Sequence, residues 1–237
     1  MKIKGILFDK DGTLLDYWGS WMPANKKVAL HVAGGNAAIS EKMLVGAGYD
    51  PATDRVASGS LLAAASNREI AEYFHSFVPE QDVEAIYEEL SDLFAAHGET
   101  GAVPVAGLAE VIAGLKNRNL TLGVATSDSE RGAYGSLKDF GILAHMDFVA
   151  GYDSGHGRKP GPGMVEGFCG ATGLSPVNVA VVGDNLHDME MGRAAGAGLL
   201  VGVLTGTSLE QDLTPHAHHV IDSIADLETL LDRVSII

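Results

Sequence analysis

Cysteine is nearly absent from the sequence: Cys169 is the single one among 237 residues. One thiol cannot form an intrachain disulfide, and it cannot supply the several thiolates of a structural zinc or iron–sulfur site. We therefore expect a protein of a reducing compartment. Cys169 shares a helical stripe with Val165 and Thr172, which favours a small packed residue over a reactive one.

Basic residues are also few. The chain has 16 Lys and Arg against 31 Asp and Glu, which gives a formal net charge of −15. Nonspecific binding to nucleic acid or to an anionic membrane needs a basic surface, so we expect neither partner. If the substrate is an anion, local positive charge must overcome the field of the whole protein.

Long apolar runs are missing as well. No run approaches the ~20 residues that cross a bilayer. The first four residues are followed by only a few apolar residues before Asp9, too few for the core of a signal peptide. We therefore expect a cytoplasmic protein. Hydrophobic residues make up 46% and charged residues 20%, which is typical of a globular chain that buries a core.

Five short apolar runs predict buried strands. They lie at residues 3–8, 120–125, 147–150, 177–182 and 199–203. Stretches with helical spacing alternate with them, at residues 108–116, 132–140, 162–172, 189–195 and 224–234. This alternation predicts βαβ units and a parallel sheet, in which ligands bind beyond the carboxyl ends of the strands.

Residues 18–98 interrupt this alternation. They contain no convincing strand, and helical patterns lie at residues 26–32, 37–44, 61–77 and 83–96. The sequence therefore predicts an α/β protein with a Rossmann-like parallel sheet core and an inserted helical cap. The core would comprise residues 1–17 and 99–237, and the cap residues 18–98.

Two carboxylates follow the first predicted strand. Asp9 and Asp11 are two residues apart, a spacing that can turn both toward one pocket. Two close anions repel each other unless a cation or a shared proton relieves them. Gly12 and Thr13 suit a tight turn whose backbone N–H groups could bind an anion. A plain Asp-Gly turn beside a solvated Asp is the alternative if this segment stands alone.

A second acidic segment follows the strand predicted at residues 177–182. Asp184 and Asp188 are four residues apart and share one face if a helix starts there. Asp184 would then join Asp9 at adjacent strand ends, in the oxygen-rich surroundings that Mg²⁺ prefers. Acids that only stabilise a helix N-terminus are the alternative, but they would not explain acids at two strand ends.

Two further segments lie between these acids. Thr126 could hold a phosphoryl oxygen, and Ser127 could do the same or be the N-cap of the next helix. Lys159 is held extended by Pro160, although a lone lysine there would ordinarily be solvated. Asp153 is a candidate partner for Lys159, with a mobile surface turn as the alternative.

Taken in order, these segments resemble the motifs of the haloacid dehalogenase-like (HAD) hydrolase superfamily. The residues that carry the resemblance are Asp9-Lys10-Asp11-Gly12-Thr13, Thr126, Lys159-Pro160, and Gly183-Asp184 with Asp188. Residues 159–162, 182–185 and 194–196 are similar to the phosphoglycolate phosphatase-like branch. The resemblance covers nearly the whole chain. Gly163 departs from it, because relatives often carry an acidic residue at that position.

The resemblance implies Mg²⁺-dependent hydrolysis of a small phosphorylated metabolite, with phosphoglycolate as the first substrate to try. Asp9 would attack phosphorus to form an aspartyl-phosphate, and Asp11 would protonate the leaving oxygen and then activate water. Mg²⁺ would be held by Asp9, the backbone carbonyl of Asp11 and Asp184, with Asp188 as an outer ligand. The residues implied to bind phosphate are Lys10, Asp11, Thr126, Ser127 and Lys159.

Other functions use some of the same residues. A β-phosphoglucomutase-like transferase would use the same Asp9 and Asp11, and a binding or regulatory homologue could keep the fold without turnover. A dehalogenase is disfavoured, because displacing a halide does not need the acid and base that Asp11 provides. The sequence leaves open whether the protein is a monomer or a homodimer.

Substrate specificity would depend on the cap. The candidates there are Trp18, Trp21, Lys26, His31, Tyr49 and Arg55, with packing or solvation as the alternative for each. His216, His218 and His219 have no metal-ligand spacing, which favours a surface loop.

Overall fold

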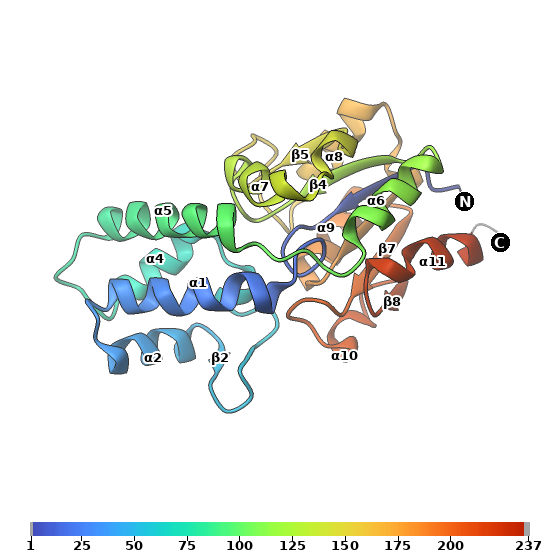
Figure 1. Ribbon diagram of the computed structural model, residues 1–237. Helices are drawn as coiled ribbons and strands as arrows, with labels where there is room; N and C mark the ends of the chain where they lie inside the picture. The colour runs from blue at the N-terminus through green and yellow to red at the C-terminus, as the bar shows by residue number, and fades with distance from the viewer. Residues whose placement is uncertain (1, 235–237) are drawn as a thin grey trace.

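The computed structural model describes residues 2–234, apart from the Glu99 side chain, and contains a sheet core and a separate block of helices (Figure 1). The core sheet has the strand order β5-β4-β1-β6-β7-β8, and all of its pairings are parallel. Its strands are β1 (Gly5–Phe8), β4 (Thr121–Ala125), β5 (Phe148–Ala150), β6 (Val179–Gly183), β7 (Leu199–Val203) and β8 (His219–Ile221). The predicted parallel α/β sheet is confirmed.

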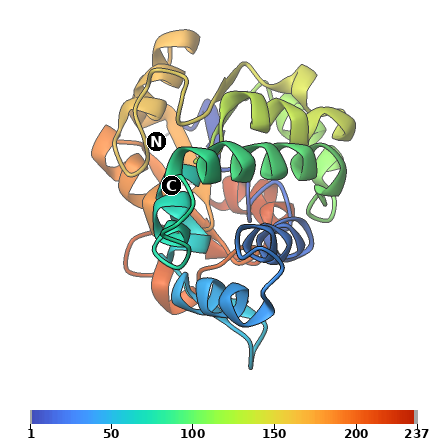
Figure 2. The ribbon, with the colours of Figure 1, turned by 90° about the vertical axis from the view of Figure 1, so that its left-hand side faces the viewer.

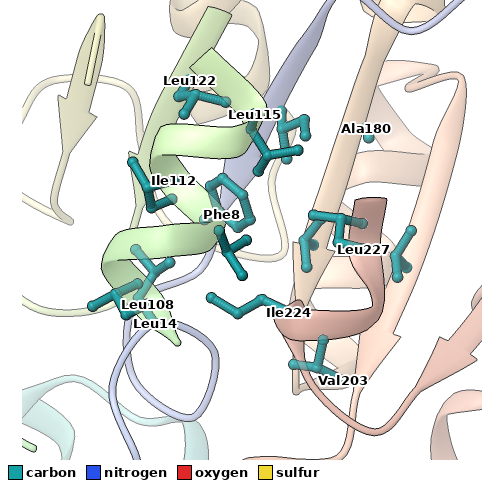
Figure 3. Packing of buried hydrophobic residues seen from close by; sticks show 14 of the residues in the cluster. Phe8, Leu14, Leu108, Ile112, Leu115, Leu122, Ala180, Val203, Ile224 and Leu227 are labelled. Atoms are coloured by element: carbon teal, nitrogen blue, oxygen red, sulfur yellow. The ribbon is translucent and has the colours of Figure 1, made fainter. Parts of the chain in front are cut away.

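Successive residues of each strand face opposite layers of the core. Ile6 and Phe8 of β1 belong to one apolar cluster and Leu7 to another. The first cluster joins the sheet to α6 (Leu108–Asn117) and α11 (Leu227–Val234). Figure 3 shows this packing, in which side chains of α6 and of the segment around Ile224 approach the face that carries Phe8. The second cluster joins the sheet to α8 (Gly163–Thr172) and α9 (Leu186–Ala195), and it includes Cys169, which is buried as expected.

The edge strand β8 was not predicted, and the expectation of a surface loop for the histidine cluster is wrong at His219. His219 begins this strand, and the Nδ1 atom of His218 accepts a hydrogen bond of 2.9 Å from the N–H of Leu200. A three-residue edge strand with exposed and half-buried side chains has too short an apolar run to be recognised. Within residues 2–234 the three histidines belong to no cluster of metal-ligating side chains.

Helix α7 (Glu130–Leu137) begins two residues before its predicted start. Its N-cap is Ser129, whose hydroxyl oxygen accepts a hydrogen bond of 3.0 Å from the N–H of Gly132. Ser127 is therefore not the N-cap of this helix. Its other predicted role, to hold a phosphoryl oxygen at the end of β4, stays a prediction.

The block of helices between β1 and α6 is called the cap below. It comprises α1 (Tyr17–Val32), α2 (Ala37–Gly46), α3 (Leu61–Ala64), α4 (Asn67–His75) and α5 (Val83–Gly101), and it has an apolar cluster of its own. Figure 2 views the molecule from this end, with the green α5 passing in front of the core. Contrary to expectation the cap also holds a short antiparallel pair, β2 (Tyr49–Asp50) and β3 (Arg55–Val56).

Local capping explains where the cap helices depart from their predicted limits. Helix α1 starts at Tyr17 rather than at residue 26, because the Asp16 carboxylate accepts hydrogen bonds from the first turn; Pro23 lies inside the helix. The helix predicted at residues 61–77 is divided at Ser66, which forms a capping box with Glu69 and so begins α4. None of the helices within residues 2–234 is both long enough and apolar enough to cross a membrane.

Packing of α6 onto the sheet should make a large contribution to the stability of the core. Ile112 is fully buried in the first cluster, so Ile112→Ala should lower the free energy of unfolding by about 2–5 kcal/mol. Val177→Ala, at a side chain 41% exposed, should change it by less than about 0.5 kcal/mol. Urea denaturation followed by circular dichroism measures both, and equal losses would contradict the assigned packing.

Candidate active site

Three neighbouring strands of the sheet end at one cavity. The order of the strands along the chain reverses at β1, which lies between β4 and β6. Asp9 follows β1, Thr126 follows β4, and Asp184 follows β6. Ligands of open parallel sheets bind outside the carboxyl ends of the strands at such a reversal. On its other side the cavity is bounded by the cap, which contributes side chains from α1, α3, α4 and α5.

The structure brings together most of the residues that the sequence singled out. Those that line the cavity are Asp9, Asp11, Thr126, Ser127, Lys159, Asp184 and Asp188. Of the six cap candidates, Trp21 lines the cavity. The other five lie outside its lining; on the cap surface, for example, Lys26 pairs with Asp54 at 2.8 Å and the Arg55 guanidinium lies over the Trp18 ring.

Lys159 is the cation at the centre of the site. Its Nζ atom lies 2.5 Å from Oδ1 of Asp9 and 2.6 Å from Oδ1 of Asp188. Burial alone would lower the pKa of Lys159. The carboxylates of Asp188 and Asp9 raise it by a larger amount, so the pKa lies above its ordinary value. Asp153, the candidate partner of Lys159, does not pair with it, because the Asp153 carboxylate instead accepts a hydrogen bond of 2.8 Å from the N–H of Glu130.

Asp9, Asp184 and Asp188 form a compact buried cluster. One carboxylate oxygen of each lies within 4.8 Å of the others. Burial raises the pKa of Asp9 to about 6, with Lys159 acting in the opposite direction and Asp188 adding to the rise. Burial, then Asp9 and Asp188, raise the pKa of Asp184 well above its ordinary value. The cluster is therefore a site at which a bound cation would be strongly favoured.

Asp188 is oriented by the start of helix α9. Its Oδ2 atom accepts a hydrogen bond of 3.0 Å from the N–H of Asn185, the N-cap residue, while its Oδ1 atom faces Lys159. This capping box starts α9 at Leu186, three residues before the predicted start. The predicted shared helix face of Asp184 and Asp188 is not formed as such, because Asp184 precedes the helix.

The segment after β7 is a part of the site that the sequence reasoning missed. The N–H of Thr207 donates a hydrogen bond of 2.8 Å to Oδ2 of Asp184, and the hydroxyl of Thr205 donates one of 2.6 Å to the carbonyl of Gly12. A side chain on Gly206 would overlap the Asp184 carboxylate. The available signal was a Thr-Gly-Thr turn at the end of a further parallel strand.

The Asp11 carboxylate accepts hydrogen bonds from two side chains, one in the core and one in the cap. Lys10 Nζ lies 2.8 Å and Trp21 Nε1 2.5 Å from the same atom, Oδ1 of Asp11. Lys10 also pairs with Asp128 at 3.1 Å and lies over the Trp21 ring. Burial raises the pKa of Asp11 to about 6; Lys10 opposes this rise, while Asp128 and Asp9 add to it.

Lys10 is itself fully buried and does not line the cavity. Its ammonium group contacts the carboxylates of Asp11 and Asp128, so its side chain does not reach a ligand in the cavity.

Thr126 is buried at the end of β4, where its backbone and side chain are both fixed. Its N–H donates to the carbonyl of Ala150, and its hydroxyl oxygen accepts a hydrogen bond of 3.1 Å from the N–H of Asp128. Because the hydroxyl acts as acceptor there, its own hydrogen remains available for a ligand oxygen.

The absence of an acidic side chain at Gly163 has a steric reason. A Cβ atom there would overlap the backbone carbonyl of His156, which approaches the start of α8. Pro162 is the N-cap of α8 and forms no side-chain cap, so the helix begins without the acid that the resemblance led us to look for.

Comparison with known proteins agrees with this geometry. N-acetylmuramic acid 6-phosphate phosphatase of Pseudomonas aeruginosa is 27% identical over 235 residues, 98% of this chain and 96% of the relative. Phosphonoacetaldehyde hydrolase of Bacillus cereus is 29% identical over 226 residues, 94% of this chain and 84% of the relative. A crystal structure from Haemophilus somnus, titled as a predicted phosphoglycolate phosphatase, has the same fold, with a TM-score of 0.75, 19% identity and coverage of 97% and 98%. Residues 3–196 match the family model of the haloacid dehalogenase-like hydrolases, and the chain belongs to that family.

Proposed function

We propose that this hydrolase is a Mg²⁺-dependent phosphatase that cleaves a small phosphomonoester through phosphoryl transfer to Asp9. The observation that carries the proposal is the convergence of Asp9, Asp11, Thr126, Lys159 and Asp184 on one cavity between core and cap. The Pseudomonas relative, whose name is that of a sugar-phosphate phosphatase, supports it over nearly the whole chain length. We further propose phosphoglycolate as the first substrate to try and a cytoplasmic location.

The residues present fit a magnesium ion. The three side chains of the cluster offer only carboxylate oxygens, the ligands of a hard cation, and burial followed by repulsion from the neighbouring carboxylates raises the pKa values of Asp9 and Asp184. Asp9, Asp184 and the backbone carbonyl of Asp11 would hold the ion. Both oxygens of Asp188 already accept hydrogen bonds, so we propose that Asp188 acts through water. Bound Mg²⁺ would neutralise charge on the carboxylates and on the phosphoryl oxygens.

The residues of the chain then divide the reaction between them. Oδ1 of Asp9 faces Lys159, which leaves Oδ2 to attack phosphorus as the bond to the alcohol oxygen breaks. Asp11 gives its proton to that oxygen, so an alcohol leaves. Asp11 next takes a proton from water, whose oxygen attacks phosphorus and displaces the Asp9 carboxylate as phosphate is released.

Positive charge and hydrogen-bond donors hold the transferring group. The Lys159 ammonium and the Thr126 hydroxyl line the cavity where they would contact phosphoryl oxygens, with Ser127 beside them. We propose that the core, residues 1–17 and 99–237, performs the chemistry, while the cap, residues 18–98, excludes water and contacts the rest of the substrate.

Asp9→Asn should reduce kcat by about 10³-fold or more while leaving the fold intact, because an amide is a far poorer nucleophile than a carboxylate. Hydrolysis of p-nitrophenyl phosphate and of phosphoglycolate measures the loss. Asp222→Asn makes the same change of charge at an exposed residue outside the cavity and should leave kcat unchanged. Retention of more than about a hundredth of wild-type kcat by Asp9→Asn would remove Asp9 from the nucleophile role.

Chelation of divalent cations should stop turnover, because the uncompensated carboxylates would repel both each other and the phosphate. Added Mg²⁺ should restore the rate, and Ca²⁺ should inhibit, since its larger and looser coordination misplaces the reacting groups. Phosphate release in chelator, with each metal added back, measures this. Full activity in excess chelator would contradict the proposed magnesium site.

Trp21→Phe keeps a ring beside Lys10 but removes the N–H donated to Asp11. Without this hydrogen bond the Asp11 carboxyl group would be less well aimed to protonate the leaving oxygen. An alkyl phosphate needs that proton, so its kcat should fall by about tenfold, whereas p-nitrophenyl phosphate has a good leaving group and should be affected much less. Trp18→Phe is the matched control, on the same helix but outside the cavity lining, and it should change neither rate. An equal loss on both esters would contradict a role for Trp21 in holding the acid.

A further inference from the structure

A second chamber adjoins the cavity at the boundary between cap and core. It is lined on the cap side by residues from Gly59 to Glu69 and on the core side by residues that include Tyr152 and Arg158. Ser127, Lys159 and His187 line both spaces. A ligand whose phosphoryl group lies beside Asp9 and Lys159 would therefore have its other end close to these shared residues, on the side of this chamber.

Arg158 and Lys159 are adjacent in the chain but serve different spaces. The Lys159 ammonium is buried against two carboxylates of the catalytic cluster. The Arg158 guanidinium lies 5.4 Å from the Tyr152 ring centre, and its Nη1 atom is 3.4 Å from the hydroxyl of Ser66, the N-cap of α4. The Tyr152 hydroxyl is in turn 3.3 Å from that of Tyr87 on α5. Arg158 is thus held by the core and reaches the cap.

The charge of Arg158 is not neutralised by an ion pair. Among the described residues it contacts a ring and a hydroxyl, and no carboxylate forms a salt bridge with it. The carboxylate of Glu69 is nearby, and its pKa is lowered by hydrogen bonds from Ser66 and then by the charges of Arg158 and His187. The acid that also lines the chamber, Glu69, is engaged elsewhere, because its Oε2 atom accepts hydrogen bonds of 2.8 and 2.6 Å from the N–H and hydroxyl of Ser66. Arg158 is an exposed residue, so a ligand can reach it.

We propose that this chamber binds the alcohol part of the substrate and that Arg158 receives a carboxylate there. The substrate class is then a phosphomonoester whose alcohol part carries a carboxylate, an inference that rests on the proposed phosphatase activity. A guanidinium presents paired donors that match a carboxylate and cannot lose its charge. In a protein of net charge −15, a substrate with two anionic ends needs a cation at each end, and Lys159 and Arg158 supply them from one loop.

Two matched pairs of esters test the class. Phosphoglycolate differs from 2-hydroxyethyl phosphate in its carboxylate, and N-acetylmuramic acid 6-phosphate differs from N-acetylglucosamine 6-phosphate by the lactyl ether that carries its carboxylate. The wild-type enzyme should prefer the carboxylated member of at least one pair by about tenfold to a hundredfold in kcat/KM, as expected for a charge-assisted contact. Absence of a preference in both pairs would overturn the inference.

Arg158→Gln should abolish that preference through KM, while hydrolysis of p-nitrophenyl phosphate stays within about twofold of wild type. Arg158→Lys should keep part of the preference, because the charge remains but the paired donors are lost. Arg233→Gln, the same change at an exposed residue of α11, is the control and should keep all of it. A preference that survives Arg158→Gln, or an equal loss on p-nitrophenyl phosphate, would overturn the role of Arg158.

Calorimetric titration of the Asp9→Asn variant, with Mg²⁺ present, separates the inference from the proposed function. Phosphoglycolate should bind more tightly than 2-hydroxyethyl phosphate, and adding Arg158→Gln should remove the difference. Failure of the wild-type enzyme to hydrolyse any ester would overturn the phosphatase proposal alone. Equal binding of the two esters would overturn the carboxylate chamber alone.

Discussion

Repulsion among three buried carboxylates is the constraint on which the rest of the site depends. Asp9, Asp184 and Asp188 bring oxygens within 4.8 Å of one another, and Lys159 offsets only one of their charges. The two negative charges that remain correspond to one divalent cation. The fold supplies the opposing force through neighbouring parallel strands, the capping box of α9 and the turn after β7, all of which fix the carboxylates through backbone bonds.

Three of the polar contacts that join the cap to the core lie near this cluster. Trp21 reaches Asp11, Ser66 meets Arg158, and Tyr87 meets Tyr152. Two of these three contacts join residues that line the catalytic cavity or the adjoining chamber. The hydrogen bonds that hold the cap against the core therefore also position residues that line the site. A shift of the cap would change the geometry of the site.

The sequence predicted those parts of the fold and the site that depend on local pattern. Parallel strands are buried on both faces, so β1, β4, β6 and β7 appear as continuous apolar runs. The proximity of Asp9 and Asp184 could be predicted because each residue follows the end of one of the predicted parallel strands. The short strands of the cap and β8 were missed because strands of only two or three residues carry no periodic signal. The hydrogen bonds of Trp21 with Asp11 and of Thr207 with Asp184 join residues far apart in the sequence, so they depend on the path of the chain between them. The pairing of Lys159 with Asp188 and not with Asp153 depends on that path in the same way.

Adjacent placement of Arg158 and Lys159 in one core loop has a consequence for how this enzyme could change in evolution or in the laboratory. If the cap alone decided which metabolite is accepted, exchanging caps between relatives would exchange their specificities. Here the loop that carries the Lys159 ammonium also lines the chamber that we propose for the leaving group. A chimera of this core with a foreign cap would inherit Arg158 together with its old preference, and a new specificity would have to be selected in both segments together.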